Sequence, residues 1–295
     1  MTKTKLIQIL FCLAFISIVI FLDPSKKIED CPEGTEKIGL GKVENEHSIL
    51  SCQMENEKGE YVFHGPYIEW YSNGKILIRG NYLNNKKDGY WITKREDGSD
   101  AIKILYADGE MDGKQMTYHE NGKKYTETHF KKGLKDGKYT EWNPSGYIIV
   151  KGQYSNGKEN GLFKKWHTNK KLEYQANYEN GILQGKVTWW HENGQTKEEG
   201  EMIDGKAEGE WIEWYETGEK KIIALFQNNE LNGDYIEFYK NGSIKKTGKN
   251  LNGYADGIWK EFRLDGTLAT RVNFVNNIPT ARICFDKEEK PISCN

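Results

Sequence analysis

Glycine recurs every 24 residues along most of this 295-residue chain, and no other feature of the sequence restricts the fold as strongly. The spacing holds in both directions from the stretch "GEWIEWYETGEKK", which begins at Gly209, without an insertion or a deletion. The anchor glycines are Gly65, Gly89, Gly113, Gly137, Gly161, Gly185, Gly209, Gly233 and Gly257. A fixed period of this length is typical of repeat proteins, in which each unit contacts mainly its neighbours. The sequence therefore predicts nine units of 24 residues over about residues 64–279.

Each unit has the pattern of a β-hairpin when its anchor glycine is counted as position 0. A second glycine stands at position 9 in eight of the nine units, and Lys170 is the exception. Asparagine precedes it at Asn73, Asn121, Asn193 and Asn241. Asn-Gly between two β-prone runs predicts a tight type I′ turn, in which both central residues have a positive φ. The return run alternates with period two, which predicts a half-buried strand.

A second, looser turn is predicted where each unit meets the next. Position 20 is always Gly or Asn, the residue types that tolerate the left-handed backbone region. Aspartate often stands immediately before an anchor glycine, and we expect its side chain to cap this turn. These aspartates are Asp88, Asp112, Asp136 and Asp256. The fold class is therefore all-β, an elongated, solenoid-like antiparallel meander that forms a single sheet of about 18 strands.

Large aromatic residues supply much of the apolar surface in these units, since only 37% of the chain is hydrophobic but it contains 17 tyrosines and 9 tryptophans. Position 2 holds Tyr67, Trp91, Gln115, Tyr139, Phe163, Val187, Trp211, Tyr235 and Trp259. Position 5 holds Trp70, Lys94, Tyr118, Trp142, Trp166, Trp190, Trp214, Phe238 and Phe262. Positions 2 and 5 face opposite sides of a regular strand. Either a bulge near the anchor glycine brings the two columns together, or both faces of the sheet carry aromatic residues.

The N-terminus has the composition of an export signal. Two lysines precede "LIQILFCLAFISIVIFL", an uncharged run that is long for a signal peptide and short for a membrane span. No small-residue cleavage site follows it, which favours an uncleaved anchor. We therefore assign residues 1–22 to a signal peptide or N-terminal membrane anchor, and we expect the rest of the chain to lie in the periplasm or at the cell surface, either anchored or secreted.

Four cysteines flank the predicted units and none lies inside them. They are Cys31, Cys52, Cys284 and Cys294. Because the units separate the two clusters, the expected disulfides are Cys31–Cys52 and Cys284–Cys294, as in an oxidising compartment. No CxxC spacing is present that would point to a metal site instead. We assign residues 23–63 to a disulfide-bearing N-terminal cap and residues 280–295 to a disulfide-bearing C-terminal cap, which would protect the exposed edges of the sheet.

Charge and motifs argue against several functions. A net charge of −2 does not predict nucleic-acid binding, and membrane contact is expected only through the N-terminal segment. "GQYSNGKE" from Gly152 and "GEMIDGKA" from Gly200 resemble a phosphate-binding loop but lack its Ser or Thr. "HENGQ" from His191 lacks the second histidine of a zinc site. No catalytic residue, cofactor or metal is predicted, and we expect no enzyme.

Other polar columns have simple structural interpretations. His119, His167 and His191 share one position, and His167 and His191 are about 9.5 Å apart if their units are adjacent, which is too far for one shared metal ion. We expect all three to be strand residues that face solvent. The carboxylates at position 4 are expected to form a solvated column balanced by nearby lysines. They are Glu141, Glu213, Glu237 and Glu261.

The units "EGEWIEWYETGEKKIIALFQNNEL" from residue 208 and "NGDYIEFYKNGSIKKTGKNLNGYA" from residue 232 resemble the MORN-type repeat in its bacterial variant form, as in YwqK-family antitoxin-like repeat proteins. The resemblance covers about residues 64–279. It implies stacked β-hairpins in an extended curved sheet that serves as a scaffold or as a surface contacting proteins or membranes. It carries no catalytic residue over to this chain.

The aromatic residues at position 5 are the candidate binding surface. They are Trp70, Trp142, Trp166, Trp190, Trp214, Phe238 and Phe262. They pack unit against unit, or they form an exposed ribbon, since contiguous exposed apolar surface usually marks an interaction site. The sequence predicts a non-enzymatic exported scaffold that presents an extended surface to an unidentified protein partner at the cell envelope. The alternative is a cell-wall or glycan-binding module that uses the exposed aromatics.

Overall fold

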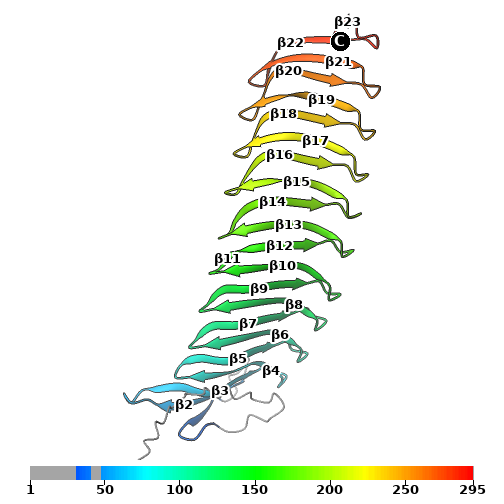
Figure 1. Cartoon of the computed structure of the whole chain (residues 1–295). Helices are drawn as coiled ribbons and strands as arrows, with labels where there is room; N and C mark the ends of the chain where they lie inside the picture. The colour runs from blue at the N-terminus through cyan, green and yellow to red at the C-terminus, as the bar shows by residue number, and fades with distance from the viewer. Residues whose placement is uncertain (1–30, 41–47, 295) are drawn as a thin grey trace, which may run out of the picture.

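The computed structural model describes residues 31–40 and 48–294, and in them every regular element is a β-strand (Figure 1). The 23 strands form one sheet, and every pairing is antiparallel. This confirms the predicted all-β meander. The predicted signal or anchor at residues 1–22 lies outside the described residues. The described ranges contain no helix that is long and apolar enough to cross a membrane.

The strands follow one another along the chain at regular intervals. The bounds of the first eleven are β1 Glu36–Leu40, β2 Ser48–Glu55, β3 Tyr61–Trp70, β4 Ile76–Leu83, β5 Lys86–Lys94, β6 Asp100–Ala107, β7 Glu110–Tyr118, β8 Lys124–Lys131, β9 Leu134–Trp142, β10 Ile148–Ser155 and β11 Lys158–Glu159. The other twelve are β12 Gly161–Trp166, β13 Leu172–Glu179, β14 Ile182–Trp190, β15 Thr196–Ile203, β16 Lys206–Trp214, β17 Lys220–Gln227, β18 Glu230–Phe238, β19 Ile244–Leu251, β20 Tyr254–Phe262, β21 Leu268–Val275, β22 Ile278–Phe285 and β23 Pro291–Ile292.

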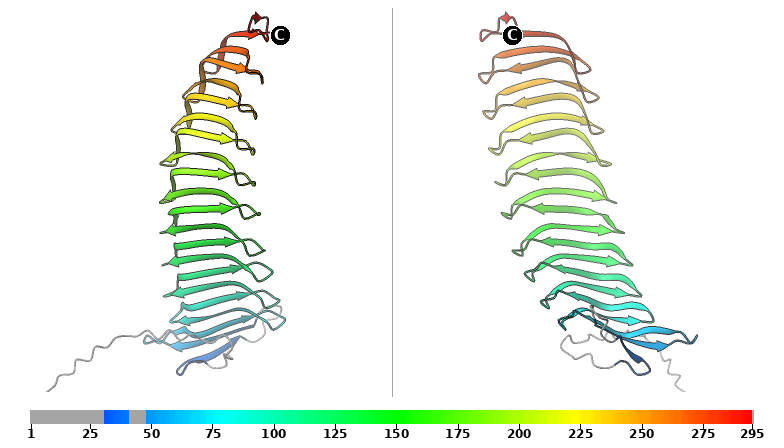
Figure 2. Two further views of the ribbon diagram at one scale, coloured as in Figure 1. Left: turned by 45° about the vertical axis from the view of Figure 1, so that its right-hand side comes forward. Right: turned by 180° about the vertical axis from the view of Figure 1, so that it is seen from behind.

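Every strand except β11 pairs with the next strand in sequence, so the sheet grows in one direction as an elongated stack (Figure 2). The only split strand among the described residues lies where Asn160 separates β11 from β12, both of which pair with β10. The first strand of a unit ends in a wider loop at position 6, and its second strand ends in a two-residue turn at positions 19 and 20. The wider loops therefore line one long side of the sheet and the tight turns line the other.

The two turn types are reversed relative to the sequence prediction. The tight turns join consecutive units, and both central residues have positive φ, as at Asn228 (52°) and Asn229 (72°). At the Asn-Gly pairs only the glycine is left-handed, as at Gly74 (80°), so the turn is not type I′. The Asn73 side-chain oxygen instead accepts a hydrogen bond from the Lys75 amide at 2.9 Å. Both turns use Gly and Asn, so residue type alone does not distinguish them.

Side-chain and backbone hydrogen bonds fix the tight turns to the preceding unit. The second residue of each turn donates its amide to a carbonyl 22 residues earlier, as Gly205 does to Leu183 at 3.0 Å. In four units the residue before the anchor glycine accepts from the first residue of the following turn, as Asp136 does from the Asn156 amide at 3.3 Å. Of the predicted aspartates, Asp136 therefore caps the turn of the next unit rather than its own. Such contacts at fixed separation explain why the period tolerates no insertion.

A bulge occurs at each anchor glycine, but it does not bring the two aromatic columns together. Ala224 pairs with Tyr235 and Phe226 pairs with Leu231, so three residues of β18 stand opposite Leu225. Because two extra residues are inserted, the alternation of side chains continues through the bulge. Positions 2 and 5 therefore lie on opposite faces, and both faces carry aromatic residues. We name them the core face, which carries position 2, and the column face, which carries position 5.

The Trp and Phe rings at position 2 of the core face lie flat over glycines of the preceding unit. A Cβ added at Gly200 would lie 2.2 Å from Cδ2 and Cε2 of Trp211, and one added at Gly152 would lie 2.3 Å from Cε1 of Phe163. The rings also contact one another, as Phe163 does with Tyr154 and Tyr178 at centroid distances of 5.6 Å and 5.2 Å. This arrangement buries large residues in a single-layer sheet, where no second layer is available to cover them.

The two predicted disulfides are present, one near each end of the sheet. Cys31 is bonded to Cys52 and Cys284 to Cys294. The Cys52 side chain is 1% exposed, and a Cβ added at Gly65 would lie 2.8 Å from Pro32 Cδ and 3.3 Å from Cys52 Cβ. The segment that carries Cys31 therefore packs against the first anchor glycine. Two disulfides are typical of a protein from an oxidising environment.

Candidate functional site

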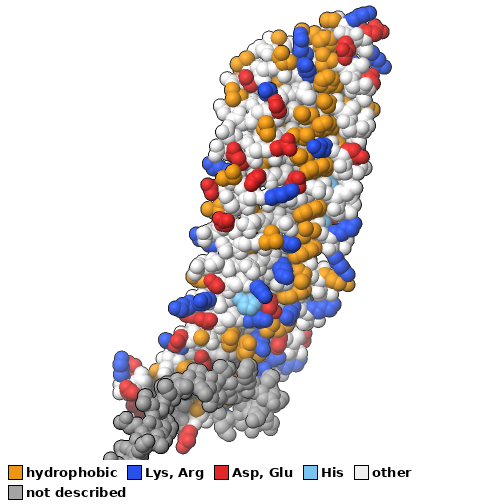
Figure 3. Space-filling view, viewed as in Figure 1, with side chains coloured by type: hydrophobic (Ala, Val, Ile, Leu, Met, Phe, Trp, Pro, Cys, Tyr) orange, Lys and Arg blue, Asp and Glu red, His pale blue; other side chains and the backbone are white. Residues whose placement is uncertain are grey.

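The candidate residues at position 5 stand in one column on the column face, at the ends of the strands that lead into the wider loops. All of them are half-buried, so they are neither a closed core nor a fully exposed ribbon. They are Trp70, Trp142, Trp166, Trp190, Trp214, Phe238 and Phe262. Figure 3 shows hydrophobic side chains gathered into a stripe along the length of the molecule, nearer the side with the wider loops. The structure thus brings the sequence-predicted residues together on one face.

A row of cross-strand neighbours runs beside this column through positions 3 and 14. Over β16, β17 and β18 the row is apolar, with Ile212 opposite Ile223 and Ile223 opposite Ile236. In the middle it is basic, with Lys151 directly opposite Lys164. Sequence reasoning did not single out these residues, because the row becomes visible only once the register of every strand pair is known. The apolar part widens the stripe and the basic part interrupts it.

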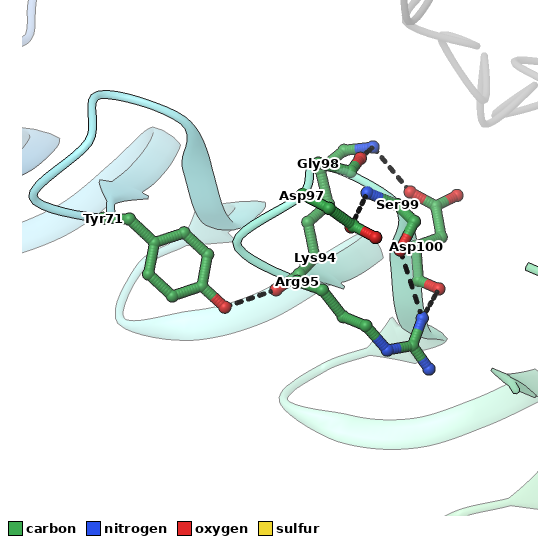
Figure 4. A network of polar contacts seen from close by, with 7 residues as sticks. All are labelled: Tyr71, Lys94, Arg95, Asp97, Gly98, Ser99 and Asp100. Atoms are coloured by element: carbon green, nitrogen blue, oxygen red, sulfur yellow. Dashed lines mark hydrogen bonds and ion pairs between the residues drawn. The ribbon is translucent and has the colours of Figure 1, made fainter. Parts of the chain in front are cut away.

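Position 6 residues hold the wider loops to the next unit, except at Asn143, whose side-chain oxygen accepts from the Tyr147 amide within its own loop. The Tyr71 hydroxyl donates to the Lys94 carbonyl at 2.8 Å (Figure 4), and Tyr215 and Tyr239 make the equivalent bonds to Phe238 and Phe262 at 2.8 Å. Arg95 donates to the Tyr118 carbonyl from the same position. The acceptors are the backbone carbonyls of the position 5 residues. Most of the candidate column is therefore fixed in place by a polar ladder along one side of the sheet.

The three histidines belong to this ladder, which corrects the expectation that they face solvent. Their Nε2 atoms donate to the carbonyls of Trp142, Trp190 and Trp214 at 2.8, 2.9 and 3.0 Å, respectively. Because a carbonyl can only accept, Nε2 carries the proton in each case. The histidines are half-buried, and each is engaged with the next unit. They are His119, His167 and His191.

We expect Tyr215→Phe to lower the free energy of unfolding by about 1 kcal/mol, because it removes one hydrogen bond and leaves the half-buried Phe238 carbonyl without this donor. Chemical denaturation of the full chain measures the change. Tyr61→Phe is the control, since the Tyr61 side chain is 59% exposed and should change stability by less than about 0.5 kcal/mol. Equal effects in the two variants would show that the ladder bond contributes nothing specific.

The carboxylates at position 4 lie on the core face and are paired as predicted. Glu213 binds Lys221 and Glu237 binds Lys245, each at 2.6 Å. Glu261 lies 3.3 Å from Lys246. Glu141 instead accepts a hydrogen bond from the Tyr139 hydroxyl at 2.8 Å, and burial together with this carboxylate raises the pKa of Tyr139. These contacts stabilise the sheet and do not assemble an acid–base pair.

Comparison with protein families agrees with this geometry. The model of the MORN repeat variant matches residues 63–84, 111–132, 159–180, 183–204, 207–228 and 231–249. Each matched segment begins two residues before an anchor glycine and contains one hairpin with its wider loop. The chain is a MORN-repeat protein. The units anchored at Gly89, Gly137 and Gly257 lie outside the matched segments but have the same two turns. No curated protein matches the chain.

MORN repeats generally act as scaffolds that contact proteins or lipids, and the family is generally non-catalytic. The near-matches to phosphate-binding loops in this MORN-repeat protein have structural roles, since Gly152 and Gly200 make room for Phe163 and Trp211. In residues 31–40 and 48–294 no group of three or more His, Cys, Asp or Glu side chains is placed to hold a metal ion.

One carboxylate pair in the MORN sheet is repulsive. Glu198 stands directly opposite Glu213, and burial followed by the Glu213 charge raises the pKa of Glu198. A raised folded-state pKa means that the folded protein binds this proton more tightly than the unfolded chain does. The resulting stability is fully present below the ordinary glutamate pKa of about 4.3 and is lost as the pH rises through the folded-state pKa.

We therefore expect Glu198→Gln to raise the stability of the MORN sheet at pH 7, by less than about 1 kcal/mol because the site is partly solvated. The gain should shrink below pH 4, where the native carboxyl is protonated. Denaturation of both proteins between pH 3 and 8 measures it, with the exposed Glu192→Gln as the control. A gain that is independent of pH would contradict the assignment to this charge pair.

Proposed function

We propose that this MORN-repeat protein is an exported, non-enzymatic scaffold whose column face presents an extended surface to a protein partner at the cell envelope. The observation that supports it is the difference between the two faces. On the core face Trp91, Phe163 and Trp259 lie over glycines and are buried, at 6%, 8% and 7% exposure. On the column face the aromatic residues stay partly exposed along the whole sheet.

Contiguous apolar surface favours a protein partner, because the column and the neighbouring isoleucines offer flat area rather than an enclosed cavity. The apolar part of the row, from Ile212 to Ile236, lies beside Trp214 and Phe238. These residues would form the centre of the contact, and the surrounding Lys and Glu residues would form its polar rim. A rigid sheet fixed by the ladder at position 6 loses little conformational freedom on binding, which favours affinity.

Export is supported by the two disulfides and by the apolar sequence at residues 6–22. A cytosolic protein would keep such cysteines reduced. Fractionation of cells that express the full chain, combined with thiol labelling without a reducing agent, tests this part. We expect the protein in the envelope or the medium, with all four flanking cysteines unreactive. Cytosolic protein with reactive cysteines would refute export.

Site-specific photo-crosslinking tests the surface itself. A photoreactive residue at position 210, on the exposed column face, should form adducts with a defined envelope protein in living cells. The same residue at position 165 is the control, because Lys165 is exposed on the core face. Adducts from position 165 alone would place the partner on the other face. The absence of adducts from either position, or from further positions on the column face, would contradict a scaffold function for this surface.

A further inference from the structure

We propose that the column face also binds an anionic polysaccharide, in a groove between Trp142 and Trp166. The groove has a volume of about 520 Å³ and lies on β9, β10 and β12. Its lining residues include Trp142, Tyr147, Ile148, Lys151, Trp166 and Lys170. Tyr147 and Ile148 occupy positions 10 and 11 of their unit, and no other unit has an aromatic followed by an aliphatic residue there. The combination of three aromatic rings with lysines is therefore confined to this part of the column.

The lysines of this region are not balanced by the protein. Lys151 pairs directly with Lys164 across the sheet, and like charges in such a pair destabilise it. No described carboxylate lies within 4.0 Å of either ammonium group, whereas Lys114, Lys124 and Lys186 on the same face are each paired with a glutamate. A smaller hollow farther along the same face shows the contrast, because its Lys186 binds Glu199 at 2.8 Å. Figure 3 shows basic side chains beside the hydrophobic stripe in the middle of the molecule.

Lys170 is a second unfavourable feature of the folded state. It occupies the position that is glycine in the other eight units, and its backbone keeps the left-handed conformation, with φ of 70°. A side chain at such a position strains the backbone, and glycine would relieve that strain. The Lys170 ammonium lies 3.5 Å from the centroid of the Tyr147 ring, at the rim of the groove. Strain that persists at a cleft is typical of functional sites.

The chemistry of these groups indicates the ligand. Aromatic rings stack on the C–H faces of sugar rings, and lysines bind carboxylate, sulfate or phosphate groups. Trp142 and Trp166 are two strands apart, about 9.5 Å from the strand spacing, which is close to the length of two linked sugar rings. A nucleic acid would need a broad basic surface, which a net charge of −2 does not supply. An acidic peptide fits the lysines but makes less use of the paired tryptophans.

Titration calorimetry of the full chain with a galacturonate oligomer tests the proposal. We compare it with the uncharged galactose oligomer of the same length and with a poly-glutamate peptide of the same charge. The galacturonate oligomer should bind at least about tenfold more tightly than either, with an affinity that falls as salt is added. The double variant Lys151→Gln/Lys164→Gln should weaken binding about tenfold, and Tyr147→Ser should weaken it severalfold.

The melting temperatures of the lysine variants distinguish a ligand site from a purely structural role of these lysines. Lys151→Gln/Lys164→Gln and Lys170→Gly should raise the melting temperature, because they relieve repulsion and strain, while they weaken binding. Lys260→Gln is the matched control, since Lys260 stands opposite Arg271 in the same row but far from the groove. It should leave the affinity unchanged.

Three results would overturn the proposal. The first is an affinity for poly-glutamate equal to that for the galacturonate oligomer, which would assign the groove to acidic peptides. The second is a loss of affinity in Lys260→Gln equal to that in Lys151→Gln/Lys164→Gln, which would indicate diffuse electrostatic attraction. The third is no binding of the galacturonate oligomer. None of them would affect the photo-crosslinking from position 210, so the protein-scaffold function and the polysaccharide site fail independently.

Discussion

Gly200→Val should destabilise the sheet by about 3 kcal/mol, because the new side chain would occupy space that the Trp211 ring already fills. A Cβ at this position would lie 2.2 Å from two ring atoms and 2.6 Å from a third. The ring lies flat on the backbone and cannot move away without losing its contacts with Trp189 and Phe226. Denaturant unfolding measures the change.

The expected coupling between Gly200 and Trp211 follows from size matching along the whole sheet. Position 15 of a unit is glycine wherever position 2 of the next unit is Trp or Phe, and it is larger elsewhere. The pairs are Gly80 with Trp91, Ile104 with Gln115, Thr128 with Tyr139, Gly152 with Phe163, Ala176 with Val187, Gly200 with Trp211, Ala224 with Tyr235 and Gly248 with Trp259. The residue at position 15 and the side chain at position 2 of the next unit therefore fill one shared space. A larger residue at one position should be compensated by a smaller residue at the other.

A double-mutant cycle tests whether Gly200 and Trp211 are coupled in this way. Gly200→Ala combined with Trp211→Tyr recreates the pair that Ala224 and Tyr235 form naturally. We expect the double variant to be more stable than the sum of the two single changes predicts, by more than about 1 kcal/mol. Gly39→Ala is the control, since a Cβ at Gly39 has no neighbour within 4 Å and its φ is not left-handed. Additive effects of Gly200→Ala and Trp211→Tyr would show that ring and glycine do not share one space.

The 24-residue period and its alternation were sufficient to predict the architecture, because a strict period leaves the chain one way to stack its units. The position of the tight turn was not predictable in the same way. Asn228 and Asn229 adopt the I′ conformation without an Asn-Gly pair, whereas the Asn73-Gly74 pair forms the wider loop. Propensity restricts both sites to the same residue types, and the hydrogen bonds to the neighbouring unit decide between them.

The candidate site was predictable as a column but not as a surface. Spacing placed Trp142 and Trp166 at equivalent positions. Their partial exposure follows from their lying on the face opposite the one where glycines make room for aromatic rings. The role of His167 depends on a carbonyl 23 residues away, which only the strand register reveals. Lys170, by contrast, could be recognised from the sequence, because it is the only residue other than glycine at position 9 of the nine units. Exceptions to a strict period are therefore the most informative places to look for function in repeat proteins.

Breaking the N-terminal disulfide with Cys31→Ser should lower the stability of that end of the sheet by about 3 kcal/mol. The bridge links residues that are 21 apart in sequence and holds the segment with Pro32 against Gly65 of β3. Its loss releases this segment and leaves that part of β3 without its contact. In a repeat protein each unit is stabilised mainly by its neighbours, so the damage should remain local. Hydrogen exchange should show faster exchange in β1, β2 and β3 and unchanged protection in β20 and β21.

Cys294→Ser is the matched control at the other end. Its bridge closes only 10 residues, and Cys294 is exposed, so we expect a smaller loss that is confined to β22 and β23. Cys31→Ser leaves Cys52 in place and creates no cavity at that buried site, so any destabilisation reports the lost cross-link. Uniformly faster exchange along the whole sheet would mean that the sheet unfolds as one cooperative unit. In that case the disulfide-bearing ends would set the stability of the entire column face, including the groove between Trp142 and Trp166.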